Sequence, residues 1–136
     1  MVNFGDFNFD GSEDVAICDG SNGGYGMPSY QVFIYSTRLK KFVRSASFTK
    51  MNSGGLGMFE IDNRKKMLMV FSKSGCCWHR TEGFAVIGGR PKKVYEFTED
   101  ATRNQGKTVE ITTRRLVNGK WRTAVKLAKT SEYYKN

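Results

Sequence analysis

The stretch 6–14, DFNFDGSED, constrains the fold of this chain more than any other part of the sequence. Three residues with side-chain oxygens, Asp6, Asn8 and Asp10, alternate with two phenylalanines. A curled backbone can therefore turn three oxygens inward while the rings pack outward. A glycine follows where the loop must bend, and Asp14 returns as a further carboxylate. Because Ca²⁺ takes about six to eight oxygen ligands, we predict a calcium loop here.

The predicted ligands are the side chains of Asp6, Asn8, Asp10 and Asp14 and the backbone carbonyl of Ser12. An EF-hand would place a bidentate Glu at the twelfth position and a helix on each side. Ile17 occupies that position and ends a strand-like Val-Ala-Ile run, so the loop is expected in a β-protein. The alternative is an acidic turn without metal, because Asp, Asn and Gly are common in turns. Three neighbouring carboxylates repel one another unless a cation neutralises them, which favours the calcium loop.

Apolar and polar residues alternate with a period of two along the whole chain, and turn residues recur about every ten positions. No segment shows a helical period. We predict an all-β single domain over residues 1–136, a compact antiparallel structure of about nine strands that is propeller-like, a sandwich or a barrel. Residues 129–136 are expected to be a frayed tail. The strands are expected at 15–18, 29–36, 41–49, 58–61, 66–72 and 92–97, and in a hairpin of 107–117 and 120–128 turned by Asn118-Gly119. The stretch 74–79 is expected to lead into a longer β segment that runs through residue 87.

Three cysteines, Cys18, Cys76 and Cys77, leave an odd count. A bond between the adjacent pair is disfavoured, because disulfides need Cα separations of about 4.4 Å or more. We expect Cys18 to bond Cys76 or Cys77 in an oxidising compartment, with three reduced thiols as the alternative. Cys77 and His79 would share a strand face, but no third group orients them and zinc sites space their cysteines more widely. We therefore expect no enzyme chemistry.

The formal net charge is +9, yet residues 1–36 hold five acids and no Lys or Arg. Such asymmetry fits a nucleic-acid surface, a membrane surface, an acidic protein partner or a solvated basic face. No apolar run reaches the 18 or more residues of a membrane span, and no signal peptide opens the chain. Because Met1 stands only five residues before the first predicted ligand, we expect a longer precursor with an export signal or a lipid anchor.

A glycine-rich loop follows the first predicted strand. Its glycines make it adaptable, and its single tyrosine is a large amphipathic anchor able to fill a pocket. The alternative is a surface turn whose tyrosine packs on its own sheet. The predicted partner-binding residues are Ser21, Asn22, Gly23, Gly24, Tyr25 and Gly26.

The stretch 5–17, GDFNFDGSEDVAI, resembles the calcium loop of integrin-type FG-GAP repeats. With NGGYGMPSYQVFIY, MFEIDNRKKML and KSGCCWH, residues 5–97 resemble a bacterial family of exported calcium-binding immunity proteins. That family protects cells against peptidoglycan hydrolases delivered by secretion machines. The resemblance implies a propeller-like β-fold similar to periplasmic inhibitors of invertebrate-type lysozyme, whose Ser/Gly/Tyr loop plugs the lysozyme cleft. It assigns that role to residues 21–26 and a structural Ca²⁺ to the acidic loop.

We therefore expect a periplasmic or otherwise exported immunity protein that binds and blocks the cleft of a lysozyme-like peptidoglycan hydrolase effector. Its partner would be that protein, with no nucleic acid and no transmembrane segment. One alternative is a calcium-dependent adhesion or surface-recognition module. A second is a nucleic-acid-binding β-domain, in which Trp121 and Tyr95 would stack on bases. The basic residues that favour it are Arg114, Arg115, Lys120, Arg122, Lys126 and Lys129.

Overall fold

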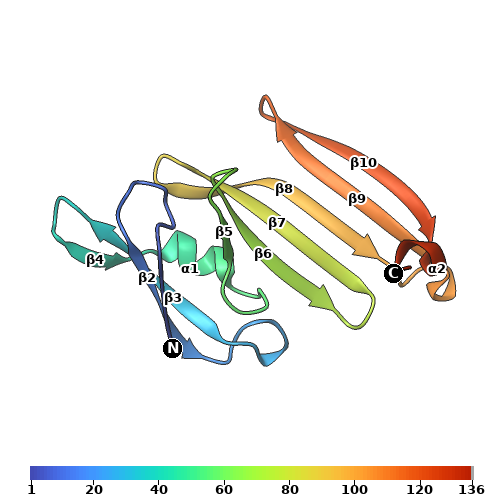
Figure 1. Cartoon of the computed structure of the whole chain (residues 1–136), viewed down its shortest axis with the longest axis horizontal. Helices are drawn as coiled ribbons and strands as arrows, with labels where there is room; N and C mark the ends of the chain where they lie inside the picture. The colour runs from blue at the N-terminus through green and yellow to red at the C-terminus, as the bar shows by residue number, and fades with distance from the viewer. Residues whose placement is uncertain (136) are drawn as a thin grey trace.

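The computed structural model describes residues 1–135, and Asn136 lies outside the described residues. Ten strands dominate this part of the chain (Figure 1). In chain order the elements are β1 (Val2–Gly5), β2 (Asp14–Gly20), the 3-10 turn η1 (Gly24–Gly26), β3 (Ser29–Ser36), β4 (Lys41–Arg44), α1 (Ala46–Asn52), β5 (Glu60–Asp62), β6 (Met67–Ser74), β7 (Trp78–Ile87), β8 (Arg90–Asp100), the 3-10 turn η2 (Asn104–Gly106), β9 (Thr108–Val117), β10 (Lys120–Lys129) and α2 (Thr130–Tyr133).

The strands form two antiparallel sheets. The first has the order β1-β2-β3-β4, and the second has the order β10-β9-β8-β7-β6-β5. Within each sheet, strands that are consecutive in the chain are neighbours, and the chain passes from one sheet to the other between β4 and β5. Neither sheet closes into a barrel within residues 1–135. Helix α1 contacts β3 of the first sheet and β8 of the second (Figure 1). The predicted all-β class is confirmed, in a sandwich-like arrangement of two sheets.

The main core joins the two sheets. Val32 of β3 and Leu68 of β6 are completely buried in the same cluster, together with Phe48 of α1. Phe7, from the acidic loop, packs edge-on against Phe59 with ring centroids 5.0 Å apart. Full burial of each such side chain contributes about 1.5 to 3 kcal/mol to the free energy of unfolding. The acidic loop is thus anchored to the core by a phenylalanine that the sequence predicted to face outward from the oxygens.

A second, smaller core lies on the outer half of the six-stranded sheet. Val109 and Ile111 of β9 are buried there, and Tyr133 of α2 packs on them. The tyrosine hydroxyl donates a hydrogen bond to Glu99, and the Thr130 amide donates to a backbone carbonyl 3.0 Å away. Residues Thr130–Tyr133, within the stretch expected to be a frayed tail, therefore form a helix that these contacts join to the sheet. Asn136, the last residue of that stretch, lies outside the described residues.

Two elements differ from the sequence prediction, and one matches it closely. Helix α1 occupies part of the predicted strand 41–49, because Ser45 caps it by accepting a hydrogen bond from the Phe48 amide at 3.2 Å. Strand β1 was not predicted, and it pairs with β2. The predicted Asn118-Gly119 turn is confirmed, with φ values of 51° and 77° between paired β9 and β10.

Candidate functional site

The acidic loop closes around its own carboxylates. Asp6 accepts hydrogen bonds from the Asp10 amide at 3.1 Å and from the Gly11 amide at 2.8 Å. Asp10 in turn accepts one from the Ser12 amide at 2.9 Å. Gly11 has a φ of 89°, a left-handed conformation that favours glycine. The loop therefore curls as the sequence predicted, with Asp6 turned into it.

Asp14 is the buried end of the loop, with 0% of its surface exposed. Its carboxylate accepts hydrogen bonds from the Phe7 amide at 2.8 Å and from the Tyr35 amide at 2.9 Å. The second bond connects the loop to β3. Burial raises the pKa of Asp14 above the usual 3.8, the two amides oppose this, and the charges of Asp10 and Asp6 raise it further. A negative charge here is therefore unfavourable without a nearby cation.

One side-chain oxygen of the acidic loop is left without a partner within residues 1–135. The side-chain oxygen of Asn8 is buried and has no hydrogen-bond partner among the described residues, while the amide nitrogen of Asn8 donates to Asp10 at 3.2 Å. The carboxylate oxygens that already accept one amide keep further lone pairs. No group of three Asp, Glu, His or Cys side chains within residues 1–135 is arranged to hold a metal. Asp6, Asp10 and Asp14 of the predicted ligand set fall under this finding, so a calcium ion at this loop stays a prediction.

Tyr25 stands at the tip of the glycine-rich loop. It has a φ of 57°, lies in η1 and keeps 61% of its surface exposed. Its hydroxyl accepts a hydrogen bond from the Gly75 amide, and the Lys73 amine lies 4.9 Å from the centre of its ring. Both contacts come from the end of β6 in the other sheet. The tyrosine therefore does not pack on its own sheet, and the sequence reasoning missed Lys73 and Gly75.

The backbone of this loop is in close contact with a second glycine-rich segment. The Gly24 amide donates to the Gly55 carbonyl at 3.0 Å, and a Cβ atom on Gly24 would lie 2.6 Å from the Gly54 oxygen. A Cβ atom on Gly23 would lie 2.8 Å from a carbonyl oxygen. Gly26 has a φ of 72°. Gly23 and Gly24 are therefore needed for the close approach of backbone atoms, and Gly26 for its left-handed conformation.

Polar side chains support the base of the loop. The Asn22 amide donates to the Ser29 hydroxyl at 3.2 Å, while Ser21 is exposed beside it. Asp19 accepts hydrogen bonds from Gln31 and Ser29, and these bonds lower its pKa. The structure thus brings all the predicted partner-binding residues into one exposed loop with a fixed base.

The cysteines pair differently from the prediction. Cys76 is bonded to Cys77, with their Cα atoms 3.8 Å apart, and Cys18 is free. The prediction that Cys18 pairs with Cys76 or Cys77 is contradicted because Cys18 packs against the main core, whereas Cys77 packs against the second core. The adjacent pair lies in the β6–β7 turn, directly after Gly75.

The basic residues of the last hairpin divide between its two faces, with Arg115, Lys120, Arg122 and Lys126 on one face and Arg114 and Lys129 on the other. Arg114 and Arg115 point to opposite faces of β9, since side chains alternate along a strand. Arg114 lies 3.9 Å from Glu96 and 4.8 Å from the ring centre of Trp121. Arg115 covers Tyr95 at 5.1 Å. The positive charge of the hairpin is therefore divided between two faces, and the two proposed stacking rings are already covered by arginine.

Comparisons with known proteins reach one solved structure. The chain is similar to a Xanthomonas protein described as related to the type IV secretion system, with 28% identity and a TM-score of 0.77. The match covers 90% of this chain and 57% of that protein, so the chain spans little more than half of the neighbour's length. No protein-family model matches, and no curated protein matches. Neither helix of the described residues has the length and apolar character needed to cross a bilayer.

Proposed function

We propose that this chain is a secretion-associated immunity protein that binds and blocks the active-site cleft of a lysozyme-like peptidoglycan hydrolase, without catalysis of its own. The fold it shares with a type IV secretion system related protein supports the association with secretion. The proposal puts the protein in the periplasm or another exported location, where its target would act.

The observation that carries this proposal is the exposed ring of Tyr25, supported from behind by Lys73 and Gly75. A rigid aromatic anchor loses little conformational entropy when it enters a pocket, so more of its contact energy appears as affinity. Ser21 and Asn22 are exposed in the same loop, and their polar side chains would replace the sugar hydroxyls that a glycan cleft normally binds. A side chain of this kind blocks a cleft by occupation alone.

Calcium binding is the second part of the proposal. Asp6, Asn8, Asp10 and Asp14, with the Ser12 carbonyl, would hold a calcium ion. The bound ion would neutralise the three carboxylates. Because Asp14 is hydrogen-bonded to the Tyr35 amide, a stable acidic loop helps to hold β3, the strand that follows the Tyr25 loop.

The test is inhibition of peptidoglycan hydrolysis by a cognate hydrolase, at a fixed calcium concentration, with the Tyr25→Ala variant. We expect a loss of about 2 to 4 kcal/mol of binding free energy, which is roughly 30- to 1000-fold in the inhibition constant. Phe4→Ala is the matched control, because Phe4 of β1 is also 61% exposed but lies outside the loop. Equal inhibition by folded Tyr25→Ala protein would show that the blocking surface lies elsewhere.

A further inference from the structure

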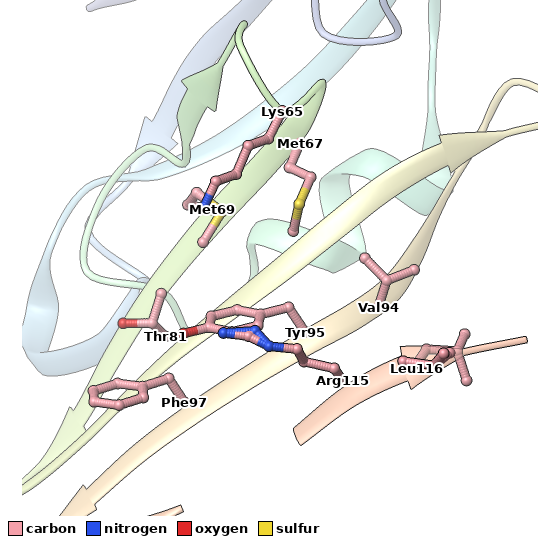
Figure 2. A pocket seen from close by; sticks show the side chains of 10 residues that line it. Lys65, Met67, Met69, Thr81, Val94, Tyr95, Phe97, Arg115 and Leu116 are labelled. Carbon is pink, nitrogen blue, oxygen red and sulfur yellow. The ribbon is translucent and has the colours of Figure 1, made fainter. Parts of the chain in front are cut away.

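A hollow of about 430 Å³ lies on the six-stranded sheet, and none of its lining residues belongs to the Tyr25 loop or the acidic loop (Figure 2). Strand register explains its position, because Met69 of β6 and Tyr95 of β8 both face Gly83 of β7, and Arg115 of β9 faces Tyr95. These residues form one row across four strands. Met67 and Phe97 complete an apolar floor. We call this site the methionine hollow; its volume falls in the usual range for small-ligand pockets.

Gly83 makes room for the methionine side chains. A Cβ atom at this position would lie 2.3 Å from the Met67 methyl carbon and 3.0 Å from the Tyr95 Cβ atom. The strand pairing also shifts register between Gly83 and Phe84. The two methionines therefore lie over bare backbone, where their unbranched, polarisable side chains can adjust to the shape of an apolar guest.

The charged groups of the hollow are all positive. Lys65 and Arg115 line it, and no acidic residue does. Neither side chain forms an ion pair within the part of the chain that the structure describes. Figure 2 shows Lys65 beside Met69 on one wall, and the Arg115 guanidinium along the ring of Tyr95 on the other. The site therefore combines an apolar floor with two cations that are free to hold an anion.

We propose that the methionine hollow binds an amphipathic anion, a molecule with an acyl chain and a carboxylate or phosphate head. The chain would lie on Met67, Met69 and Phe97, and the head would be held by Lys65 and Arg115. Arginine and lysine bind either head group, and arginine can do so with two parallel hydrogen bonds. A simple anion would leave the apolar floor exposed to water, and a cationic amphiphile would be repelled.

The test is a titration of protein that carries ¹³C-labelled methionine methyl groups, followed by NMR. The probes are dodecanoate and dodecyl phosphate below their micelle concentrations, with acetate and dodecyltrimethylammonium as controls. We expect saturable shifts of the Met67 and Met69 signals with both anionic amphiphiles, and the tighter one identifies the preferred head group. Met27 and Met51 lie outside the hollow and serve as internal references.

Arg115→Gln should weaken binding about tenfold or more, because it removes a charged hydrogen-bond donor from the head group. Lys65→Gln, in an exposed turn, is the second variant should Arg115→Gln disturb the sheet. Arg38→Gln is the matched control, since it removes one positive charge from the β3–β4 turn. The absence of saturable shifts, equal shifts with acetate or with the cationic amphiphile, or an equal loss of affinity in Arg38→Gln would each overturn the proposal.

Discussion

Tyr25 accepts a hydrogen bond from the backbone amide of Gly75, which lies 50 residues further along the chain and in the turn of the other sheet. This contact joins the glycine-rich loop to the β6–β7 turn. Tyr25→Phe keeps the ring and removes the acceptor, so we expect the Gly75 amide to exchange with solvent faster. The expected loss of stability is about 0.5 to 1.5 kcal/mol, as for a single hydrogen bond. Amide exchange by NMR is the measurement, and unchanged protection of Gly75 would contradict the contact.

Gly24→Ala should destabilise the fold more than an ordinary loop glycine does. The new methyl group would meet the Gly54 oxygen at 2.6 Å, and this neighbour is backbone that cannot easily move. We expect the free energy of unfolding, measured with urea, to fall by about 2 to 3 kcal/mol, as for other overpacked sites. Gly119→Ala is the control, because its Cβ atom would be in open space and only its φ of 77° is unfavourable; about 1 kcal/mol is expected there. Equal effects would mean that the two loops can separate freely.

Calcium should raise the melting temperature of chelator-treated protein. Binding to the folded state alone adds about 2.7 kcal/mol at a concentration a hundredfold above Kd. Asp10→Ala should remove most of this gain, whereas Asp62→Ala, which removes an acid at the end of β5, should keep it. Thermal unfolding with and without EDTA is the measurement. If the wild-type melting temperature is the same in both conditions, the loop does not bind calcium.

The stability of the metal-free protein should depend on pH through the titration of Asp14. The pKa of this residue is raised in the folded chain, so its contribution to the free energy of unfolding is fully present below the usual 3.8 and is lost as pH rises through the folded pKa. In chelator, wild type should therefore lose stability relative to Asp14→Asn as pH rises through this window. Excess calcium should reverse the trend, because a cation favours the charged carboxylate. A parallel pH profile for the two proteins in chelator would contradict the raised pKa.

The cysteine pairing predicts one reactive thiol in unfolded, unreduced protein and three after reduction. Cys18→Ser should bring the first number to zero, because Cys18 is the free cysteine. Mass spectrometry of unreduced peptides should find Cys76 and Cys77 bonded within a single peptide. A peptide that links Cys18 to either of them would restore the pairing expected from sequence.

Local sequence signals predicted the local structure well. Asn118-Gly119 predicted the last hairpin, because few other residue pairs accept two positive φ values. The acidic stretch predicted a curled loop, because Gly11 also accepts a positive φ. Helix α1 was missed because it is only seven residues long, although Ser45, a common N-cap residue, was available as a signal. The packing of Tyr25 on Lys73 and Gly75 depends on how two sheets meet, and no local pattern encodes that.

The division of the core into two clusters affects the order in which parts of this protein unfold. Both sheets share the main cluster, so separating them exposes one large apolar surface at once. The second, smaller cluster joins α2 to β8, β9, β10 and the β6–β7 turn, and β10 has a mostly exposed surface along its whole length. Strands β9 and β10 can therefore melt as a separate cooperative unit, at a lower free energy than the rest. Under mild denaturing conditions the chain would then keep a folded amino-terminal portion, including the Tyr25 loop, after its carboxyl-terminal hairpin has come apart.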